Sequence, residues 1–376
     1  MFESTSSMEN PERDLARQII ENTNTNLFLT GRAGTGKTTF LRQIREEVHK
    51  RMVVLAPTGI AAINAGGVTI HSFLQLPFAP FIPGMQFRTD QFRMPDRKKR
   101  LIRSLDLIVI DEISMVRADL LDSVDAALRR YRDPMRPFGG VQLLLIGDLQ
   151  QLSPVVKDED RELLSRYYDS EYFFSSHALQ KTPFVTVELQ TVYRQSDDDF
   201  LHLLNAVRNS TIDAELLARL NARYIPDFRP PEGAAYVRLV THNHQADAIN
   251  RAEMTALTTP AFTYDAEVKD KFPESSYPAA ERLTLKRGAQ VMFIRNGTAG
   301  EDHYFNGMLS NVPRETWNNA RYVLDERTNE IQEVIDGTFT QYPLRPAWAI
   351  TIHKSQGLTF ERAIIDVQGA FAHGQT

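Results

Sequence analysis

The stretch GRAGTGKTT, residues 31 to 39, contains the residue types and spacing that most clearly predict chemistry. It fits G-x-x-x-x-G-K-[ST], a loop whose backbone N–H groups surround phosphates. In such a loop the lysine reaches the β- and γ-phosphates, and the hydroxyl after it binds Mg²⁺. The residues expected at ATP are Gly34, Thr35, Gly36, Lys37, Thr38 and Thr39, with Thr38 on the metal. The spacing predicts that this protein binds a nucleotide, and it names no task.

Two carboxylates follow an apolar run in LDLIVIDEIS, residues 105 to 114. Asp111 is predicted to hold Mg²⁺, and Glu112 to polarise the attacking water as general base. An Asp-Glu pair is also a common polar end of a strand. The phosphate loop in the same chain favours the catalytic interpretation.

A third apolar run, VQLLLIGDLQQLSPV, ends in polar residues at 147 to 151. An amide at this point can hydrogen-bond the γ-phosphate or the water, and so respond to whether ATP is intact. Gln151 is therefore the predicted sensor.

The segment VVLAPTGIAAINAGGVTIHSF, residues 53 to 73, offers hydroxyls, an imidazole and open backbone for contact with a sugar–phosphate chain. The predicted contacts are Thr58, Gly59, Thr69 and His71, with Phe73 expected to stack on a base. A single histidine beside apolar residues is more often a core or turn residue. The interpretation of His71 depends on the motif as a whole.

Alternating strands and helices must position these groups. Residues 26 to 30, NLFLT, read as a strand, and the segment after the glycines has apolar Phe40, Leu41, Ile44 and Val48 at helical spacing. Strand, glycine turn and helix is the order that directs the positive end of the helix at phosphates. The fold class predicted is α/β.

Composition excludes several classes of protein. The 376 residues are 42% hydrophobic and 24% charged, and no apolar run reaches the length of a membrane span. The polar, acidic first residues do not resemble a signal peptide, and zero cysteines exclude disulfides and thiolate sites. We expect a cytoplasmic protein, nucleoid-associated if bacterial, without membrane contact. Because the net charge is −5, any binding of DNA phosphates requires a local basic channel.

Eight ordered motifs carry a resemblance to a known family. They are GRAGTGKTT, APTGIAAINAGGVTIHSF, IDEISM, GDLQQLSPV, VYRQ, VTHNHQADAIN, GAQVMFIRN and AITIHKSQGLTF. Their order resembles that of the Pif-type superfamily 1 DNA helicases, relatives of the RecD-like enzymes, from about residue 10 to residue 376.

The resemblance implies two RecA-like P-loop NTPase domains. The first spans residues 1–188, with a hairpin insertion at 74–103 that includes the basic residues Arg97, Lys98, Lys99 and Arg100. The second spans 189–260 and 342–376, with a small SH3-like β-barrel inserted at 261–341. A few barrel residues are expected to be missing near 310–313. The charge run at 97–100 could contact DNA or be a solvated face.

The resemblance also assigns further site residues. Arg194 is expected to cross a cleft onto the γ-phosphate, and Gly357 to connect DNA to the nucleotide. The DNA contacts implied are Thr241, His242, Asn243, Thr351, His353, Lys354 and Ser355. Residues 241 to 243 could instead only cap the helix that follows. Gln18 could read adenine, although its spacing departs from the family pattern and it could simply lie on a helix.

The activity implied is ATP-driven 5′→3′ movement on single-stranded DNA, with unwinding of duplexes at single-strand/duplex junctions. G-quadruplexes and RNA–DNA hybrids are candidate substrates, and a monomer is expected as the minimal motor. The alternative is a nucleotide-switched DNA-binding subunit of a larger complex. Family members continue past HGQT into a segment with a second cleft arginine, so we expect residues beyond Thr376.

Overall fold

The computed structural model describes residues 10–84, 94–193, 198–231, 233–274, 277–294, 312–325, 327–328, 330–355 and 360–366. The chain divides into two compact units. The first consists of Met1–Arg208 with Arg321–Val334, and the second of Asn209–Ala320 with Ile335–Thr376. Among the helices in these described ranges, none is long and apolar enough to cross a bilayer.

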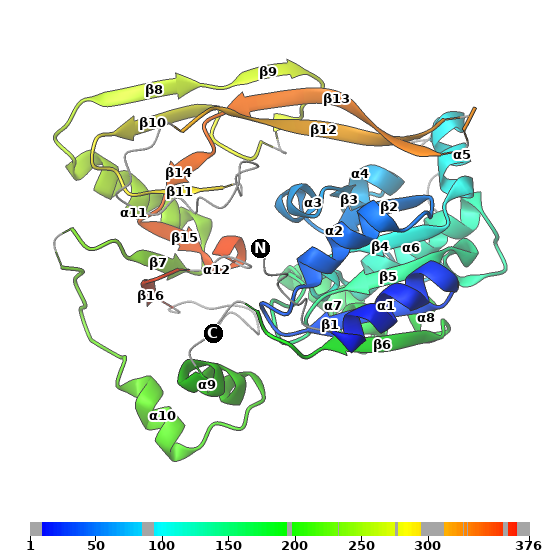
Figure 1. The fold of residues 1–376 in the computed structure, drawn as a ribbon, viewed down its shortest axis with the longest axis horizontal. Helices are drawn as coiled ribbons and strands as arrows, with labels where there is room; N and C mark the ends of the chain where they lie inside the picture. Colours follow the sequence, from blue (N-terminus) through cyan, green and yellow to red (C-terminus); the bar gives the residue numbers. More distant parts are fainter. Residues whose placement is uncertain are drawn as a thin grey trace, which may run out of the picture. The chain divides into compact units, whose positions relative to one another are not determined.

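A six-stranded parallel sheet forms the centre of the first unit (Figure 1). Its strands lie in the order β3-β2-β4-β5-β1-β6. They are β1 (Asn26–Gly31), β2 (Met52–Ala56), β3 (Val68–Thr69), β4 (Leu107–Ile110), β5 (Gln142–Ile146) and β6 (Phe184–Leu189). Because β4 and β1 both pair with β5, the carboxyl ends of these three strands meet at one edge. The α/β class and the RecA-like first domain are confirmed.

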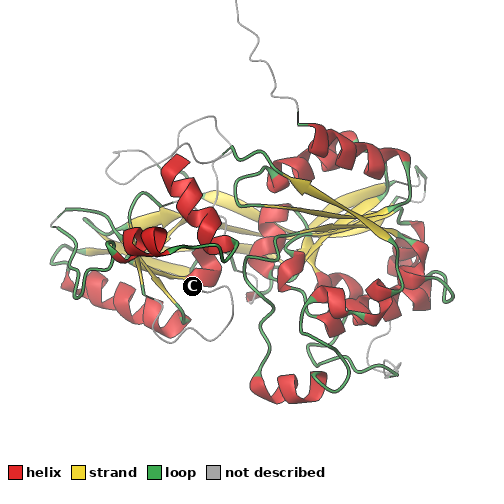
Figure 2. Cartoon of the chain, turned by 90° about the horizontal axis from the view of Figure 1, so that it is seen from below, coloured by secondary structure: helices red, strands yellow, loops and turns green. Residues whose placement is uncertain are grey.

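Helices cover both faces of this sheet (Figure 2). They are α1 (Pro11–Asn22), α2 (Lys37–Glu47), α3 (Gly59–Ala65), α4 (Ile70–Leu74), α5 (Asp96–Ser104), α6 (Ala118–Tyr131), α7 (Asp158–Leu164) and α8 (His177–Gln180). Helix α9 (Asp198–Arg208) also belongs to the first unit. Short 3₁₀ turns lie at Ile113–Met115 (η1), Pro137–Gly140 (η2) and Phe173–Ser175 (η3).

Strand residues alternate between two hydrophobic cores, one on each face of the sheet. In β2, Val53 and Leu55 belong to one core and Val54 to the other, and in β1 Phe28 is separated in the same way from Leu27 and Leu29. A parallel sheet covered on both faces needs apolar residues at every strand position. The continuous apolar runs of the sequence follow from this requirement.

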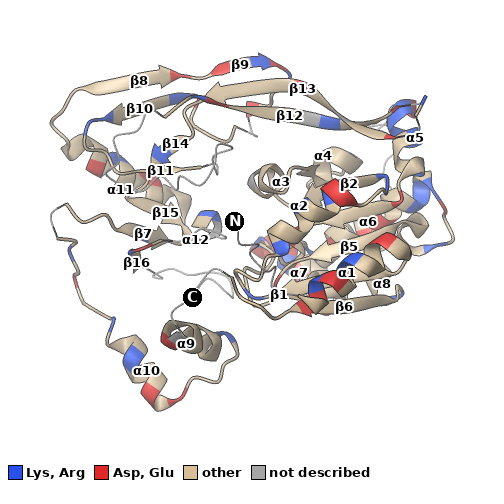
Figure 3. Cartoon of the chain, in the orientation of Figure 1, with Lys and Arg blue, Asp and Glu red and all other residues tan. Residues whose placement is uncertain are grey.

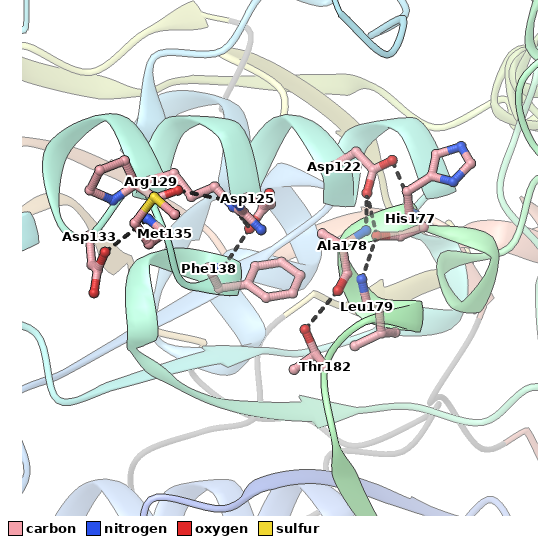
Figure 4. A network of polar contacts seen from close by, with 12 residues as sticks. Asp122, Asp125, Arg129, Asp133, Met135, Phe138, His177, Ala178, Leu179 and Thr182 are labelled. Carbon is pink, nitrogen blue, oxygen red and sulfur yellow. Dashed lines mark hydrogen bonds and ion pairs between the residues drawn. The ribbon is translucent and has the colours of Figure 1, made fainter.

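Helix α6 carries two buried aspartates, Asp122 and Asp125, that organise the surrounding loops (Figure 4). Asp122 accepts hydrogen bonds from Ser176 Oγ at 2.5 Å, from Ala178 N at 3.0 Å and from His177 N at 3.2 Å. These bonds satisfy the start of α8, where backbone N–H groups otherwise have no partner within the helix. Asp125 accepts from Phe138 N in the same manner and also pairs with Arg129.

Residues 321–334 belong to the first unit although they come from a distant part of the sequence. The hydroxyl of Tyr322 lies 3.5 Å from both Val54 N and Gly66 O, and its ring meets Phe73 edge-on at 6.2 Å between centroids. Leu324 joins the hydrophobic core. This segment therefore packs next to α4.

The second unit contains a smaller parallel sheet in the order β15-β7-β16. Its strands are β7 (Val237–Val240), β15 (Ala349–Thr351) and β16 (Ala363–Ile365), and its helices are α10 (Ala214–Asn221), α11 (Asn243–Ala256) and α12 (Ile352–Ser355). The remaining strands are β8 (Ala261–Asp265), β9 (Glu267–Asp270), β10 (Arg282–Lys286), β11 (Val291–Phe293), β12 (Glu315–Leu324), β13 (Ile331–Gln341) and β14 (Leu344–Pro346).

The first compact unit extends beyond residue 188, and the domain boundary at residues 188 and 189 stays a prediction. Helix α9 groups with the first unit up to Arg208, which pairs with Asp148 at the end of β5. The predicted insertion at 261–341 contains β8 to β13, including the antiparallel pairs β8–β10 and β9–β13. Closure of these strands into a barrel stays a prediction. The predicted gap near 310–313 falls mostly outside the described residues, as does the middle of the 74–103 insertion.

Candidate functional site

The phosphate loop joins β1 to α2 through two glycines that other residues could replace only with strain. Gly36 caps α2 with φ of 89°, in the left-handed region. A Cβ on Gly31 would come within 2.8 Å of Leu189 O and Thr35 Oγ1. The loop thus presents the amino end of an eleven-residue helix, whose free N–H groups and dipole attract anions.

Lys37 is the first residue of α2, and its ammonium folds back onto the loop. Its Nζ donates to Gly31 O at 2.6 Å and to Arg32 O at 3.1 Å. Burial lowers its pKa, while Asp148, Glu112 and Asp111 oppose that shift in this order. The lysine therefore lies within electrostatic range of the carboxylates that follow β4 and β5.

Asp111 and Glu112 follow β4 directly, as predicted. Burial raises the pKa of Asp111 to about 6. It raises the pKa of Glu112 to about 7, with the charge of Asp111 adding to the shift. Glu112 also has a left-handed backbone with φ of 52°, a conformation that costs energy for a side chain of this kind. Strain and repulsion at one point are typical of a site that binds a cation or moves a proton.

The donor set fits Mg²⁺ and a nucleoside triphosphate. Mg²⁺ prefers carboxylate and hydroxyl oxygens, and binding would relieve the repulsion between Asp111 and Glu112. The Thr38 hydroxyl on the first turn of α2 and the Asp111 carboxylate would hold it. Thr35 is buried and donates from Oγ1 to Arg32 O at 2.9 Å, which stabilises the loop, whereas Thr38 and Thr39 are exposed.

Gln151 lies in the turn after β5, where its amide meets a second acidic residue. Gln151 Nε2 donates to Asp148 Oδ2 at 3.0 Å, and Arg208 Nη1 lies 2.5 Å from the same oxygen. No sequence motif pointed to Arg208, because it comes 60 residues after Asp148 in an amphipathic helix. Only the fold brings the two together.

Tyr193 connects the loop to the segment of the predicted cleft arginine. Its N–H donates to Gly34 O at 2.9 Å, and a Cβ on Gly36 would lie 3.8 Å from its ring. Asn10, which caps α1, donates to the Tyr193 hydroxyl at 3.1 Å. Arg194 itself lies outside the described residues. Gln18 is exposed on α1, and its contact with adenine stays a prediction.

The predicted DNA contacts of the first unit lie on two short helices. Thr58 is exposed and caps α3, Gly59 has open space beside it, and Thr69 caps α4 through a bond from Ser72 N. Phe73 is only 3% exposed in the core, which corrects the expectation that it stacks on a base. The exposed aromatic ring is Phe78, stacked on His71 at 4.6 Å and 86% exposed.

The basic helix α5 is attached to the same region (Figure 3). Lys98 Nζ donates to Ser72 O at 3.0 Å and lies 5.5 Å from the centre of the Phe73 ring. Burial lowers the pKa of Lys98 to about 8. Of the four basic residues at 97–100, Lys98 thus holds the helix α4 that carries His71.

The predicted contacts of the second unit lie at the carboxyl ends of β7 and β15, which are parallel neighbours. Thr241 is buried and its hydroxyl bonds to His242 Nδ1 at 2.8 Å, while His242 caps α11 and Asn243 is exposed. His242 therefore caps α11, and DNA contact by residues 241 to 243 stays a prediction.

After β15, the buried Thr351 leads into α12, which contains His353, Lys354 and Ser355. Partial burial, followed by the charge of Arg345, lowers the pKa of Lys354, whose side chain still reaches solvent. Ser355 Oγ donates to Ile352 O at 2.8 Å. The side chain of His353 and all of Gly357 lie outside the described set.

Comparison with curated proteins finds ATP-dependent DNA helicases. PIF1 of Homo sapiens is 32% identical over 378 residues, covering 93% of this chain and 55% of the human protein. Pif1 of Campylobacter jejuni is 28% identical over 390 residues, covering 93% of this chain and 85% of its own length. The chain spans about half the length of its vertebrate relatives.

Solved structures agree with this result. The chain is 39% identical to Bacteroides sp Pif1 in complex with ADP-AlF4, with a TM-score of 0.89. The superposed region covers 98% of this chain and 89% of the other. Bacteroides Pif1 bound to ssDNA gives a TM-score of 0.69 at 39% identity, covering 98% and 88%. A family model described as PIF1-like helicase matches residues 9–216. The chain belongs to the family of PIF1-like helicases.

Proposed function

We propose that this chain is the motor of an ATP-dependent DNA helicase that moves 5′→3′ along single-stranded DNA and opens duplexes at junctions. The observation that carries the proposal is the edge of the six-stranded sheet. There Lys37, Asp111 and Glu112 come within electrostatic range of one another, from β1 and β4 on either side of β5. Relatives that match 93% of this chain are named ATP-dependent DNA helicases.

Each residue at this edge has a proposed role in hydrolysis. The loop N–H groups and Lys37 bind the β- and γ-phosphates, while Thr38 and Asp111 hold the metal. When bound, Mg²⁺ supplies positive charge to the phosphate oxygens. Glu112 takes a proton from the attacking water, and its pKa near 7 suits a group that gains and releases protons at neutral pH.

Three more residues are proposed to link hydrolysis to movement. Gln151 orients the water or the γ-phosphate, and Arg194 stabilises negative charge on the γ-phosphate. Tyr193 supports the second proposal, since the residue before Arg194 is bonded to the phosphate loop. Gly357 is proposed to relay the position of DNA to the nucleotide.

The proposed DNA path uses backbone contacts that do not depend on base sequence. Thr58, Gly59, Thr69 and His71 contribute from the first unit, and Phe78 replaces Phe73 as the stacking ring. From the second unit come Thr241, His242, Asn243, Thr351, His353, Lys354 and Ser355. A motor must bind every sequence equally, and hydroxyl, amide and ammonium contacts to phosphates allow this.

The setting of this activity follows from composition and family. The absence of cysteine fits a reducing compartment, and we propose the cytoplasm, on the nucleoid if the cell is bacterial. A monomer is proposed as the minimal motor, with G-quadruplexes and RNA–DNA hybrids as further substrates.

Strand displacement on oppositely tailed duplexes tests the proposal. With ATP and Mg²⁺, the chain should release the strand from a duplex with a 5′ single-stranded tail and leave a 3′-tailed duplex intact. Lys37→Ala is the control that should abolish release. Release from the 3′-tailed duplex alone would contradict the proposed direction and indicate 3′→5′ movement. ATP-dependent DNA binding without hydrolysis would instead support a nucleotide-switched binding subunit.

A further inference from the structure

Arg208, the last residue of α9, makes an ion pair with a carboxylate at the end of the sensor strand. Its Nη1 lies 2.5 Å from Asp148 Oδ2. Asp148 is 1% exposed, and the Arg208 side chain is 20% exposed. A carboxylate buried to this degree needs a partner, because loss of hydration costs several kcal/mol. Arg208 provides that partner.

Asp148 also organises the turn that carries Gln151. Its Oδ1 accepts from Gln150 N at 3.1 Å, its Oδ2 accepts from Gln151 Nε2 at 3.0 Å, and its backbone carbonyl accepts from Gln151 N at 3.0 Å. A carboxylate paired with arginine only accepts hydrogen bonds, so the amide nitrogen of Gln151 must face it. The orientation of the Gln151 amide thus depends on Asp148.

Without Arg208, the buried Asp148 carboxylate would lose the cation that it pairs with. The contact between Asp148 Oδ2 and Gln151 Nε2 would then lose its fixed geometry.

We propose that Arg208 is a positioning residue for ATP hydrolysis, acting through Asp148 to fix the amide of Gln151. The inference rests on the proposed function, because it takes Gln151 as the sensor. Arg208 is also the last residue of the first unit before the chain enters the second. The ion pair therefore fastens the sensor turn to the end of α9.

A double-mutant cycle separates positioning from general stabilisation. Arg208→Ala should lower kcat for ATP hydrolysis at saturating single-stranded DNA by at least about tenfold, with KM for ATP within about threefold. In a Gln151→Ala background the same substitution should change kcat by less than about twofold, because the group that it positions is gone. Equal losses in both backgrounds, or no loss in either, would overturn the proposal.

Two controls address folding. Arg208→Lys keeps a charge and should recover part of the lost kcat. Arg129→Ala breaks the ion pair of another shielded aspartate, Asp125, and should lower the melting temperature while kcat is unchanged. If Arg129→Ala lowers kcat as much as Arg208→Ala does, at a similar loss of melting temperature, Arg208 is only structural.

Affinity for a transition-state analogue gives a readout that needs no turnover. Arg208→Ala should weaken binding of ADP with aluminium fluoride about tenfold more than binding of ADP alone. Equal weakening of both would contradict the proposal. The parent chain could show no DNA-stimulated hydrolysis while Arg208→Ala still selectively weakens binding of ADP with aluminium fluoride. That result would refute the motor and leave the positioning role intact.

Discussion

At the scale of single residues, the site combines groups that destabilise one another. Asp111 and Glu112 are adjacent and partly buried, and Glu112 lies within electrostatic range of Asp148. Their raised pKa values show that folding has made the charged forms less favourable. Such conflict is expected where a chain stores strain for use in binding or catalysis.

The conflict predicts that Glu112→Gln stabilises the folded chain while removing hydrolysis. The pKa of Glu112 rises from 4.5 to about 7 on folding. Near pH 4 the side chain is protonated in both states and does not destabilise the fold, whereas above pH 7 its carboxylate destabilises the fold fully. Without nucleotide, the variant should gain on the order of 1–3 kcal/mol at pH 8 and little at pH 4.5. Denaturant unfolding at both pH values measures the gain.

The matched control is Glu159→Gln, at a carboxylate whose side chain is 78% exposed. It should change neither the stability nor the rate of ATP hydrolysis. If Glu112→Gln hydrolysed ATP at the parental rate, Glu112 would not be the base.

At the scale of elements, buried aspartates on α6 accept hydrogen bonds from backbone N–H groups of short neighbouring elements. Those N–H groups have no backbone acceptor within their own element. Helix α8 has only four residues and cannot satisfy its own first N–H groups. Asp122 accepts from two of them and from the Ser176 hydroxyl, which in turn caps the helix through Leu179 N. The regular helix thus fixes an irregular one.

Asp122→Ala should therefore destabilise the first unit strongly. It leaves three donors without their acceptor, and because each unsatisfied buried donor costs about 1–3 kcal/mol, we expect a loss of about 3–5 kcal/mol. Chemical denaturation measures the loss, with Glu162→Ala as control at an exposed ion pair with Arg166, for which at most about 1 kcal/mol is expected. The affinity of the folded protein for ATP should be unchanged. A loss as small as that of the control would contradict the network in Figure 4.

At the scale of the whole molecule, a net charge of −5 gives no general attraction to DNA. Binding must come from local cations, and each phosphate that they neutralise releases counterions. Affinity for single strands should consequently fall steeply with salt and vary little with sequence.

Lys354→Ala should weaken binding of an unstructured oligonucleotide and reduce the slope of log affinity against log salt by about one unit. Fluorescence anisotropy across a salt series measures the slope. Lys157→Ala, at a lysine 76% exposed and outside the proposed path, should leave it unchanged. An unchanged slope for Lys354→Ala would remove this residue from the phosphate contacts.

The sequence by itself determined the parts of this protein that are local in the chain. The phosphate loop, the acidic pair after β4 and the strands that carry them were predicted correctly, because glycine turns and apolar runs depend on neighbouring residues. The order of the eight motifs also indicated the family to which the chain belongs.

Tertiary structure decided what depends on burial and on distance along the chain. Phe73 and Phe78 look equally available as aromatic residues, but the first lies in the core and the second is exposed, because α4 turns one face inward. Arg208 meets Asp148 across 60 residues, since α9 returns to the end of β5. Sequence spacing cannot show such a contact, because it is produced by the packing of elements that are separate in the chain.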